Sequence, residues 1–292
     1  MKIEPDRLMI QAPHGDIAAL VWPAPGRPRL LAAHGNGFNA MSLKPMLAAL
    51  AAKFDIIAVD LRGHGRTSLP ADPETHHSWD VYADDILHVL AALDRPADLL
   101  AGHSMGAASL LLAAGRMEAP PPLALIEPVV LPPAAYLAAR TPFWPLFRAR
   151  IGLGERARRR ANGWPAREDV LARYASKPAF AAWAPGVLEA YLEDGLIETQ
   201  DGWRLACDPA WEGANFEACR HDLMGAAGRV GAWAHILKAD QGSTVMNPHG
   251  LAKRGAAISL MNEVSHLAPM EAPQRVAAWV TGVAERTGLK LA

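Results

Sequence analysis

A serine stands between two glycines at residues 102–106, where the chain reads Gly-His-Ser-Met-Gly. An apolar run at 98–101 precedes this stretch, and a helix-like run at 107–116 follows it. A strand that turns sharply into a helix would hold Ser104 in a strained conformation with its hydroxyl clear of the sheet, and neither flanking glycine could carry a side chain there. The following helix would direct its unpaired amide N–H groups at an oxyanion beside that hydroxyl. The pattern therefore predicts a nucleophilic serine.

Two upstream motifs make this pattern more specific. One apolar run ends in the glycine-rich loop HGNGFN at 34–39, and another leads into the motif DLRGHG at 60–65. With GHSMG following at 102–106, the chain resembles the α/β-hydrolase superfamily over nearly its whole length. The resemblance implies that the backbone N–H groups of Asn36 and Met105 form an oxyanion hole.

In that superfamily the acid and the histidine of the catalytic triad follow the serine in that order. Asp240 and His266 each come shortly after an apolar run, at 232–237 and 256–261, that qualifies as a late strand of the sheet. Such positions lie at the carboxyl edge of a parallel sheet, where open α/β sheets bind ligands. We therefore expect Ser104, Asp240 and His266 to form the triad.

Glu127 is a rival acid. Some relatives carry the acid at the end of the strand that follows the nucleophile helix, and the run at 123–126 qualifies as that strand. The superfamily usually has glycine three residues before the later acid, whereas this chain has Leu237 there. Asp240 is still favoured, because Glu127-Pro128 suits the start of a connection that leaves the sheet.

These side-chain types together predict acyl transfer. A serine hydroxyl is a poor nucleophile at neutral pH, so His266 would accept its proton during attack and return a proton to the leaving group. Asp240 would hold the imidazole in one tautomer and stabilise the imidazolium. We expect a carboxylesterase-like serine hydrolase that forms an acyl-enzyme on Ser104. Its substrate would be a small carboxylic ester or similar acyl compound with an apolar moiety.

Two alternatives stay open. Some relatives use the same triad to hydrolyse a carbon-carbon bond in a β-ketone or a dienoic acid. Others would act as ligand sensors, in which turnover is slow and closure over the ligand is the signal. The haloalkane dehalogenase and epoxide hydrolase branches are disfavoured, because they attack with aspartate where this chain has Ser104.

The elements around these motifs alternate between strand and helix patterns. Helices are expected over 42–52, 79–93, 107–116 and 271–286, and a hairpin is expected to join 16–22 to 29–33. This alternation predicts an α/β fold, with a mostly parallel central sheet and helices on both faces.

The pattern changes over 131–216, where prolines break up helical stretches and five of the nine tryptophans occur. The resemblance implies a helical cap domain here, inserted into a core made of 1–130 and 217–292. Its aromatic residues could line an apolar pocket above the serine, or they could build the small core that such an insert needs. Phe143 and Trp144 are the first candidates for substrate binding.

The composition narrows the classes of partner. The formal net charge of −1 over 292 residues argues against a nucleic-acid or anionic-membrane partner. No apolar run is long enough to span a bilayer, and residues 1–11 contain acids and a proline where a secretory peptide needs an apolar core. A cytoplasmic location is therefore expected, and the oligomeric state is left open.

No cofactor or metal ion is expected. The proposed reaction requires neither, and the adjacent His76 and His77 have no third ligand at helical or hairpin spacing. Cys207 and Cys219 are the only cysteines and lie close in sequence, so reduced thiols are expected rather than a structural disulfide.

Overall fold

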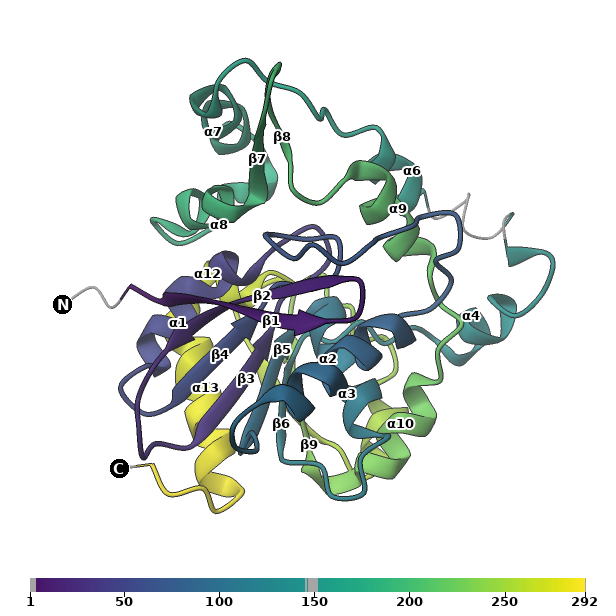
Figure 1. The fold of residues 1–292 in the computed structure, drawn as a ribbon. Helices are drawn as coiled ribbons and strands as arrows, with labels where there is room; N and C mark the ends of the chain where they lie inside the picture. The colour runs from purple at the N-terminus through teal and green to yellow at the C-terminus, as the bar shows by residue number, and fades with distance from the viewer. Residues whose placement is uncertain (1–3, 145, 147–151, 292) are drawn as a thin grey trace.

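The computed structural model describes residues 4–144, 146 and 152–291, which form a central sheet with helices on both faces (Figure 1). The sheet has eight strands in the order β1-β2-β4-β3-β5-β6-β9-β10. The β1–β2 and β2–β4 pairs are antiparallel and the later pairs are parallel, so the expected α/β fold is confirmed. The strands are β1 (Asp6–Ala12), β2 (Gly15–Trp22), β3 (Arg29–Ala33), β4 (Asp55–Val59), β5 (Leu99–His103), β6 (Leu123–Ile126), β9 (Ala234–Ala239) and β10 (Ala257–Met261).

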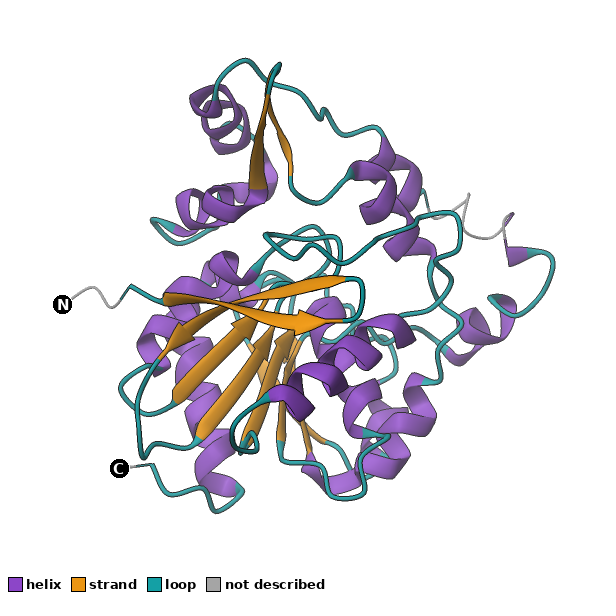
Figure 2. Cartoon of the chain, in the orientation of Figure 1, coloured by secondary structure: helices purple, strands orange, loops and turns teal. Residues whose placement is uncertain are grey.

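Helices cover the sheet in two layers (Figure 2). On one face α3 packs between α2 and α10, and on the other face α1 packs against α13. The helices outside the insert are α1 (Lys44–Leu50), α2 (Asp80–Ala92), α3 (Ser104–Ala114), α10 (Leu223–Val230), α11 (Pro248–Ala252), α12 (Ala268–Glu271) and α13 (Pro273–Arg286), with short 3-10 helices η1 (Ala40–Leu43) and η3 (Gly231–Trp233). All four helices expected from sequence are present, with ends that differ by a few residues.

The central strands β3, β4 and β5 are buried along their whole length and are apolar except at one end, where Arg29, Asp55 and His103 lie. In β4, Ile57 and Val59 belong to the core beneath α2 and α3, whereas Ile56 and Ala58 belong to the core beneath α1 and α13. Successive side chains of a strand point to opposite faces, so a sheet covered on both sides needs continuous apolar strands. This packing fixes the carboxyl-terminal ends of the strands, and the site residues follow directly after those ends.

The expected hairpin between 16–22 and 29–33 is wrong. β4 lies between β2 and β3, and the antiparallel partner of β2 within the hairpin is β1. The turn that joins β1 to β2 places His14 and Gly15 at positive φ, 72° and 154°. Most of β1 is exposed, and its only apolar run is the three residues Leu8, Met9 and Ile10, which is shorter than the runs that identified the other strands.

Residues 133–217 add a group of helices and a hairpin at one end of the sheet (Figure 1). Aromatic residues of this group, among them Tyr174, Trp183 and Tyr191, share one continuous core with α1 and α13. That residues 131–216 act as a cap remains a prediction. The elements are α4 (Pro133–Ala138), α6 (Leu153–Arg158), α7 (Arg167–Ala175), η2 (Pro178–Phe180), α8 (Val187–Gly195), β7 (Leu196–Thr199), β8 (Gly202–Leu205) and α9 (Pro209–Glu217).

None of the helices in the described ranges is long and apolar enough to cross a bilayer. The same part of the chain contains no group of three or more His, Cys, Asp or Glu residues that could hold a metal ion. Cys207 and Cys219 are both buried and unbridged.

Candidate active site

Ser104 lies at the sharp turn between β5 and α3, with a φ of 55°. A Cβ added to Gly102 would lie 2.7 Å from Leu110 Cδ1, and one added to Gly106 would lie 2.3 Å from the carbonyl oxygen of His34. Both distances are far shorter than a carbon atom tolerates, so only glycine fits on either side of the serine. The elbow predicted from the sequence is therefore present in the structure.

His266 reaches the serine from the loop after β10. Its Nε2 lies 2.9 Å from Ser104 Oγ. The ring of His103 supports this loop, since its Nε2 donates a hydrogen bond to the His266 carbonyl oxygen at 2.8 Å. Burial lowers the pKa of His103 to about 3, so His103 stays neutral and keeps a single ring N–H for that bond. His103 thus anchors the backbone of the loop that carries His266.

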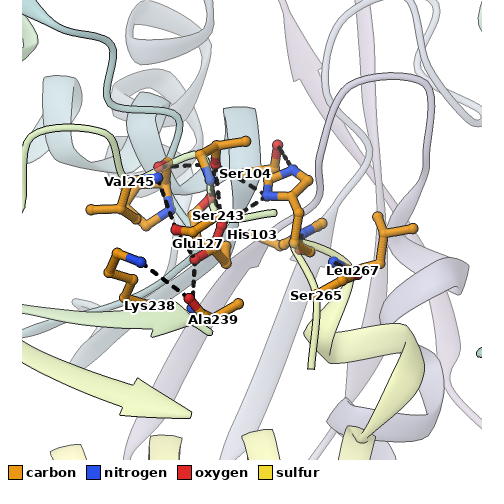
Figure 3. Close-up of polar contacts among 12 residues, drawn as sticks. His103, Ser104, Glu127, Lys238, Ala239, Ser243, Val245, Ser265 and Leu267 are labelled. Carbon is orange, nitrogen blue, oxygen red and sulfur yellow. Dashed lines mark hydrogen bonds and ion pairs between the residues drawn. The ribbon is translucent and has the colours of Figure 1, made fainter. Parts of the chain in front are cut away.

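Glu127 provides the carboxylate behind the histidine, and Figure 3 shows it close to Ser104 and His103. Its Oε2 lies 3.1 Å from His266 Nδ1. The carboxylate also accepts hydrogen bonds from Ala239 N, Ser243 Oγ and Thr244 N at 2.6, 2.6 and 2.9 Å. Burial would raise the pKa of Glu127, but the hydrogen bonds from His266, Ser243 and the two backbone N–H groups outweigh it and lower the pKa to about 2. Glu127 is therefore a carboxylate at neutral pH.

The ionised Glu127 sets the tautomer of His266. A carboxylate can only accept hydrogen bonds, so His266 Nδ1 must carry the proton that it shares with Glu127. In the neutral form of this tautomer Nε2 is unprotonated and can accept the hydroxyl proton of Ser104, as a general base requires. Thr244 Oγ1 lies 3.1 Å from the same Nδ1 and adds a second polar neighbour.

Asp240 does not occupy the place expected for it. It follows β9 but is exposed, and its carboxylate accepts hydrogen bonds from the backbone N–H groups of Glu263 and Val264 at 3.0 and 3.2 Å. It therefore shapes the loop that leads to His266 without contacting the imidazole. Glu127 reaches the imidazole because β6 lies next to β5 in the sheet, and its position one residue after that strand was the sequence signal for it.

The glycine-rich loop passes directly against Ser104. A Cβ added to Gly35 would lie 3.1 Å from Ser104 Cβ. Asn36 follows in this loop, and Met105 is the second residue of α3, where a helix leaves its N–H groups without intrahelical partners. The structure thus brings both expected oxyanion residues next to the serine, and their donor role remains a prediction. His34 braces the loop, with Nδ1 2.7 Å from the carbonyl oxygen of Gly35 and Nε2 accepting from Leu61 N at 2.9 Å.

A group of aromatic residues lies beside this loop. The ring of Phe38 is 6.3 Å from that of His103, 5.8 Å from that of Trp183 and 5.6 Å from that of Tyr191, measured between centroids. The backbone after Trp183 is tied to α12, just past His266, because Ala184 N donates to Met270 O at 2.8 Å. We call Phe38, Trp183 and Tyr191 the aromatic wall.

Phe143 and Trp144, the aromatic residues favoured by the sequence, lie elsewhere. Trp144 is buried in a separate small cluster with Ala139 and Cys219, and its Nε1 donates to Glu217 O at 3.0 Å. Phe143 is 63% exposed. Trp144 thus builds the core of its own segment, which was the structural alternative for such residues, and the structure gives neither residue a contact with the site.

The matches to known proteins concern the family and the fold. A family model described as the alpha/beta hydrolase family matches residues 30–279. The 2-(acetamidomethylene)succinate hydrolase of Mesorhizobium japonicum is 39% identical over 89 residues, which are 30% of this chain and 31% of that protein. Protein phosphatase methylesterase 1 of Schizosaccharomyces pombe is 35% identical over 98 residues, 30% of this chain and 28% of that protein. Each match thus spans under a third of the relative.

Solved structures extend the likeness to the whole fold. The crystal structure of E-2-(acetamidomethylene)succinate hydrolase superimposes with a TM-score of 0.76 at 21% identity, covering 96% of this chain and 99% of the other. A thioesterase domain from the curacin biosynthetic pathway gives a TM-score of 0.74 at 17% identity, covering 95% and 99%. At these identities the likeness concerns the fold alone.

Proposed function

The chain belongs to the alpha/beta hydrolase family, and on that premise we propose that it is a serine hydrolase acting on a carboxylic ester or a similar acyl compound. The observation that carries the proposal is the chain of contacts from Ser104 Oγ to His266 Nε2 at 2.9 Å and from His266 Nδ1 to Glu127 Oε2 at 3.1 Å. Glu127 takes the role of the acid in place of Asp240.

The reaction has two halves. Ser104 Oγ attacks the acyl carbon while His266 Nε2 takes the hydroxyl proton, and the carbonyl oxygen becomes an oxyanion that the N–H groups of Asn36 and Met105 stabilise. His266 then gives its proton to the departing alcohol, which leaves an acyl group on Ser104. A water molecule then attacks the acyl carbon and loses a proton to His266, which passes that proton to the departing Ser104 Oγ, so that the acid is released and the hydroxyl is restored. Glu127 stabilises the imidazolium in both halves.

The aromatic wall supports a substrate with an apolar part. Phe38 belongs to the loop that also carries Asn36, and Trp183 and Tyr191 come from residues 131–216, which we propose to act as a cap. Aromatic side chains beside a nucleophile favour burial of an aliphatic or aryl group next to the reacting carbonyl. Phe143 and Trp144 are no part of this surface.

A fluorophosphonate probe and an ester substrate test the proposal. Ser104→Ala is expected to remove both labelling and hydrolysis while leaving Tm nearly unchanged, because the hydroxyl is the only group lost. Ser109→Ala is the matched control, since Ser109 lies on the same helix and its Oγ donates to Met105 O at 2.8 Å; it is expected to keep both activities. Ester turnover retained by Ser104→Ala would overturn the proposal.

The same assay separates the two alternatives. Turnover of diketones without turnover of esters would favour carbon-carbon bond hydrolysis. A single slow turnover, together with a ligand-dependent rise in Tm, would favour a sensor.

A further inference from the structure

We propose that Asn215, on α9, is a positioning residue for the oxyanion hole, and that it acts through the side chain of Asn36. The inference rests on the proposed function, because the position of the Asn36 backbone N–H matters only if this group stabilises an oxyanion at Ser104.

The side-chain amide of Asn36 is held at both ends by α9. Its Nδ2 donates to the backbone carbonyl oxygen of Glu212 at 3.0 Å, and its Oδ1 accepts from Asn215 Nδ2 at 3.0 Å. Asn36 itself lies in the loop that passes against Ser104. Helix α9 therefore makes two hydrogen bonds to the side chain of Asn36, the residue expected to supply an oxyanion donor.

The direction of every bond in this network follows from one carbonyl group. The Glu212 carbonyl oxygen can only accept, so the end of the Asn36 amide that faces it must be Nδ2. Oδ1 of Asn36 then faces Asn215, which must present its own Nδ2. The Oδ1 of Asn215 is left to accept from the hydroxyl of Tyr82, at 2.7 Å. Asn215 is completely buried, so it has no water to replace a lost partner.

The two peptide groups that flank Gly37 are each fixed by a bond of their own. Gly37 N donates to His64 Nε2 at 3.0 Å, and Gly37 O accepts from the hydroxyl of Tyr191 at 3.1 Å. The Asn36 N–H has no such bond: among the residues that the structure describes, none accepts a hydrogen bond from it. The other end of that peptide group, Gly35 O, accepts from Phe38 N at 3.2 Å and from His34 Nδ1 at 2.7 Å. The side-chain bonds of Asn36 to α9 are thus a second constraint on residue 36, which comes from outside the loop.

Loss of the Asn215 donor should impair the transition state more than substrate binding. Removing one oxyanion-hole donor outright costs about 10²–10³ in kcat, and a donor that is only misdirected should cost less. We expect Asn215→Ala to lower kcat by about 10- to 100-fold with KM changed by less than about threefold. Asn215→Asp should behave alike, because a carboxylate cannot donate to Asn36 Oδ1.

A double-mutant cycle separates positioning from general support of the fold. In an Asn36→Ala background the Asn215 side chain has nothing left to position, so Asn215→Ala is expected to cause little further loss of kcat. The affinity of a trifluoromethyl ketone, which forms a tetrahedral oxyanion on Ser104, should fall in parallel with kcat/KM in the single variants.

Trp211→Phe is the matched control on the same helix. Its indole Nε1 donates to Arg62 O at 3.1 Å, so the change removes one bond between α9 and the core without touching residues 34–39. It is expected to lower Tm about as much as Asn215→Ala while leaving kcat and ketone affinity within about twofold. If Asn215→Ala does not fold, Asn215→Asp, which keeps the size of the side chain, takes its place in the cycle.

Failure of this inference differs from failure of the proposed function. If Ser104→Ala abolishes hydrolysis but both Asn215 variants keep kcat and ketone affinity at the level of Trp211→Phe, the inference is overturned and the function stands. Additive losses of kcat in the double-mutant cycle would overturn it as well. Hydrolysis that survives Ser104→Ala would overturn the function itself.

Discussion

Glu127 and His266 are 139 positions apart in sequence, yet Oε2 of the first lies 3.1 Å from Nδ1 of the second. Three further donors, Ala239 N, Ser243 Oγ and Thr244 N, hold the Glu127 carboxylate in place. Its backbone has a positive φ of 49°, an uncommon conformation for a residue with a side chain. Ser104 and Glu127 thus both have positive φ and each directly follows one of two neighbouring strands, β5 and β6. Their side chains contact opposite nitrogens of the His266 ring.

The first prediction compares the two carboxylates. Glu127→Gln should lower kcat/KM for an ester by about 10²–10⁴, because the amide can present a donor to Nδ1 and so favour the wrong tautomer of His266. Asp240→Asn should lower it no more than about tenfold, since one amide oxygen can still accept from the Glu263 or Val264 N–H. Steady-state kinetics on both variants measures the two losses of kcat/KM. A larger loss in Asp240→Asn than in Glu127→Gln would assign the role of the acid to Asp240.

Local features of this site could be predicted from the sequence, and long-range ones could not. The glycines around Ser104 form a short contiguous motif, so the sequence alone predicts the elbow, although the atoms that crowd Gly106 belong to Ala33 and His34. His266 was found because a strand pattern ends shortly before it. The sequence favoured Asp240 over Glu127 as the partner of His266, whereas the structure places Glu127 against the ring. Both residues follow strands, and only the packing of the loops decides which carboxylate meets the imidazole.

The aromatic wall shows the same limit. Phe38 and Trp183 lie on separate parts of the chain, and nothing in the residues around either one indicates that they meet. Trp144 has the same residue type and also lies within 131–216, but it packs against Ala139 and Cys219. Residue type and segment were therefore insufficient to choose among the tryptophans, because Trp144 packs in a separate small cluster whereas Trp183 packs in the core that also contains α1 and α13.

A second prediction concerns the aromatic wall. If an acyl chain packs against Trp183, kcat/KM should rise about fourfold per added methylene, from about 0.8 kcal/mol each, until the space is filled. Trp183→Ala should flatten this trend while sparing acetyl esters, because the catalytic residues stand on the sheet. Phe143→Ala is the control, since its exposed ring should leave the series unchanged. A parent enzyme that loses rate with every added carbon would contradict an apolar site.

A third prediction concerns the stability of the fold at acidic pH. Burial lowers the pKa of His64 and His221 to about 4 and that of His103 to about 3, whereas an unfolded histidine titrates near 6.5. Between about pH 6.5 and 4 the unfolded chain therefore binds more protons at these histidines than the folded chain does. The contribution of the three histidines to the free energy of unfolding is complete above pH 6.5 and is lost as pH falls. Each histidine adds up to about 1.4 kcal/mol per pH unit to the slope of the free energy of unfolding against pH.

Asp60 acts in the opposite direction. Burial raises its pKa to about 6, so between about pH 4 and 6 the folded state binds the extra proton, and this one group favours folding as pH falls. Three histidines outweigh one carboxyl, and urea unfolding from pH 7 to 5 should show a net loss of stability. His221→Asn should reduce the slope by up to about 1.4 kcal/mol per pH unit. An unchanged slope in that variant would mean that His221 takes up its proton in the folded state.

The last prediction returns to the elbow. An alanine at position 106 would place its Cβ 2.3 Å from the carbonyl oxygen of His34 and 2.7 Å from that of Ala33. Both are backbone atoms at the start of the loop that carries Asn36, so relief of the clash must displace that loop from Ser104. Gly106→Ala should therefore lower the free energy of unfolding by about 1–3 kcal/mol and lower kcat as well. Gly163→Ala is the control, because no heavy atom lies within 4 Å of its added Cβ; it should change neither quantity. A Gly106→Ala enzyme with normal kcat would show that the loop can yield without disturbing the oxyanion donors, and would weaken the case that its position is tightly set.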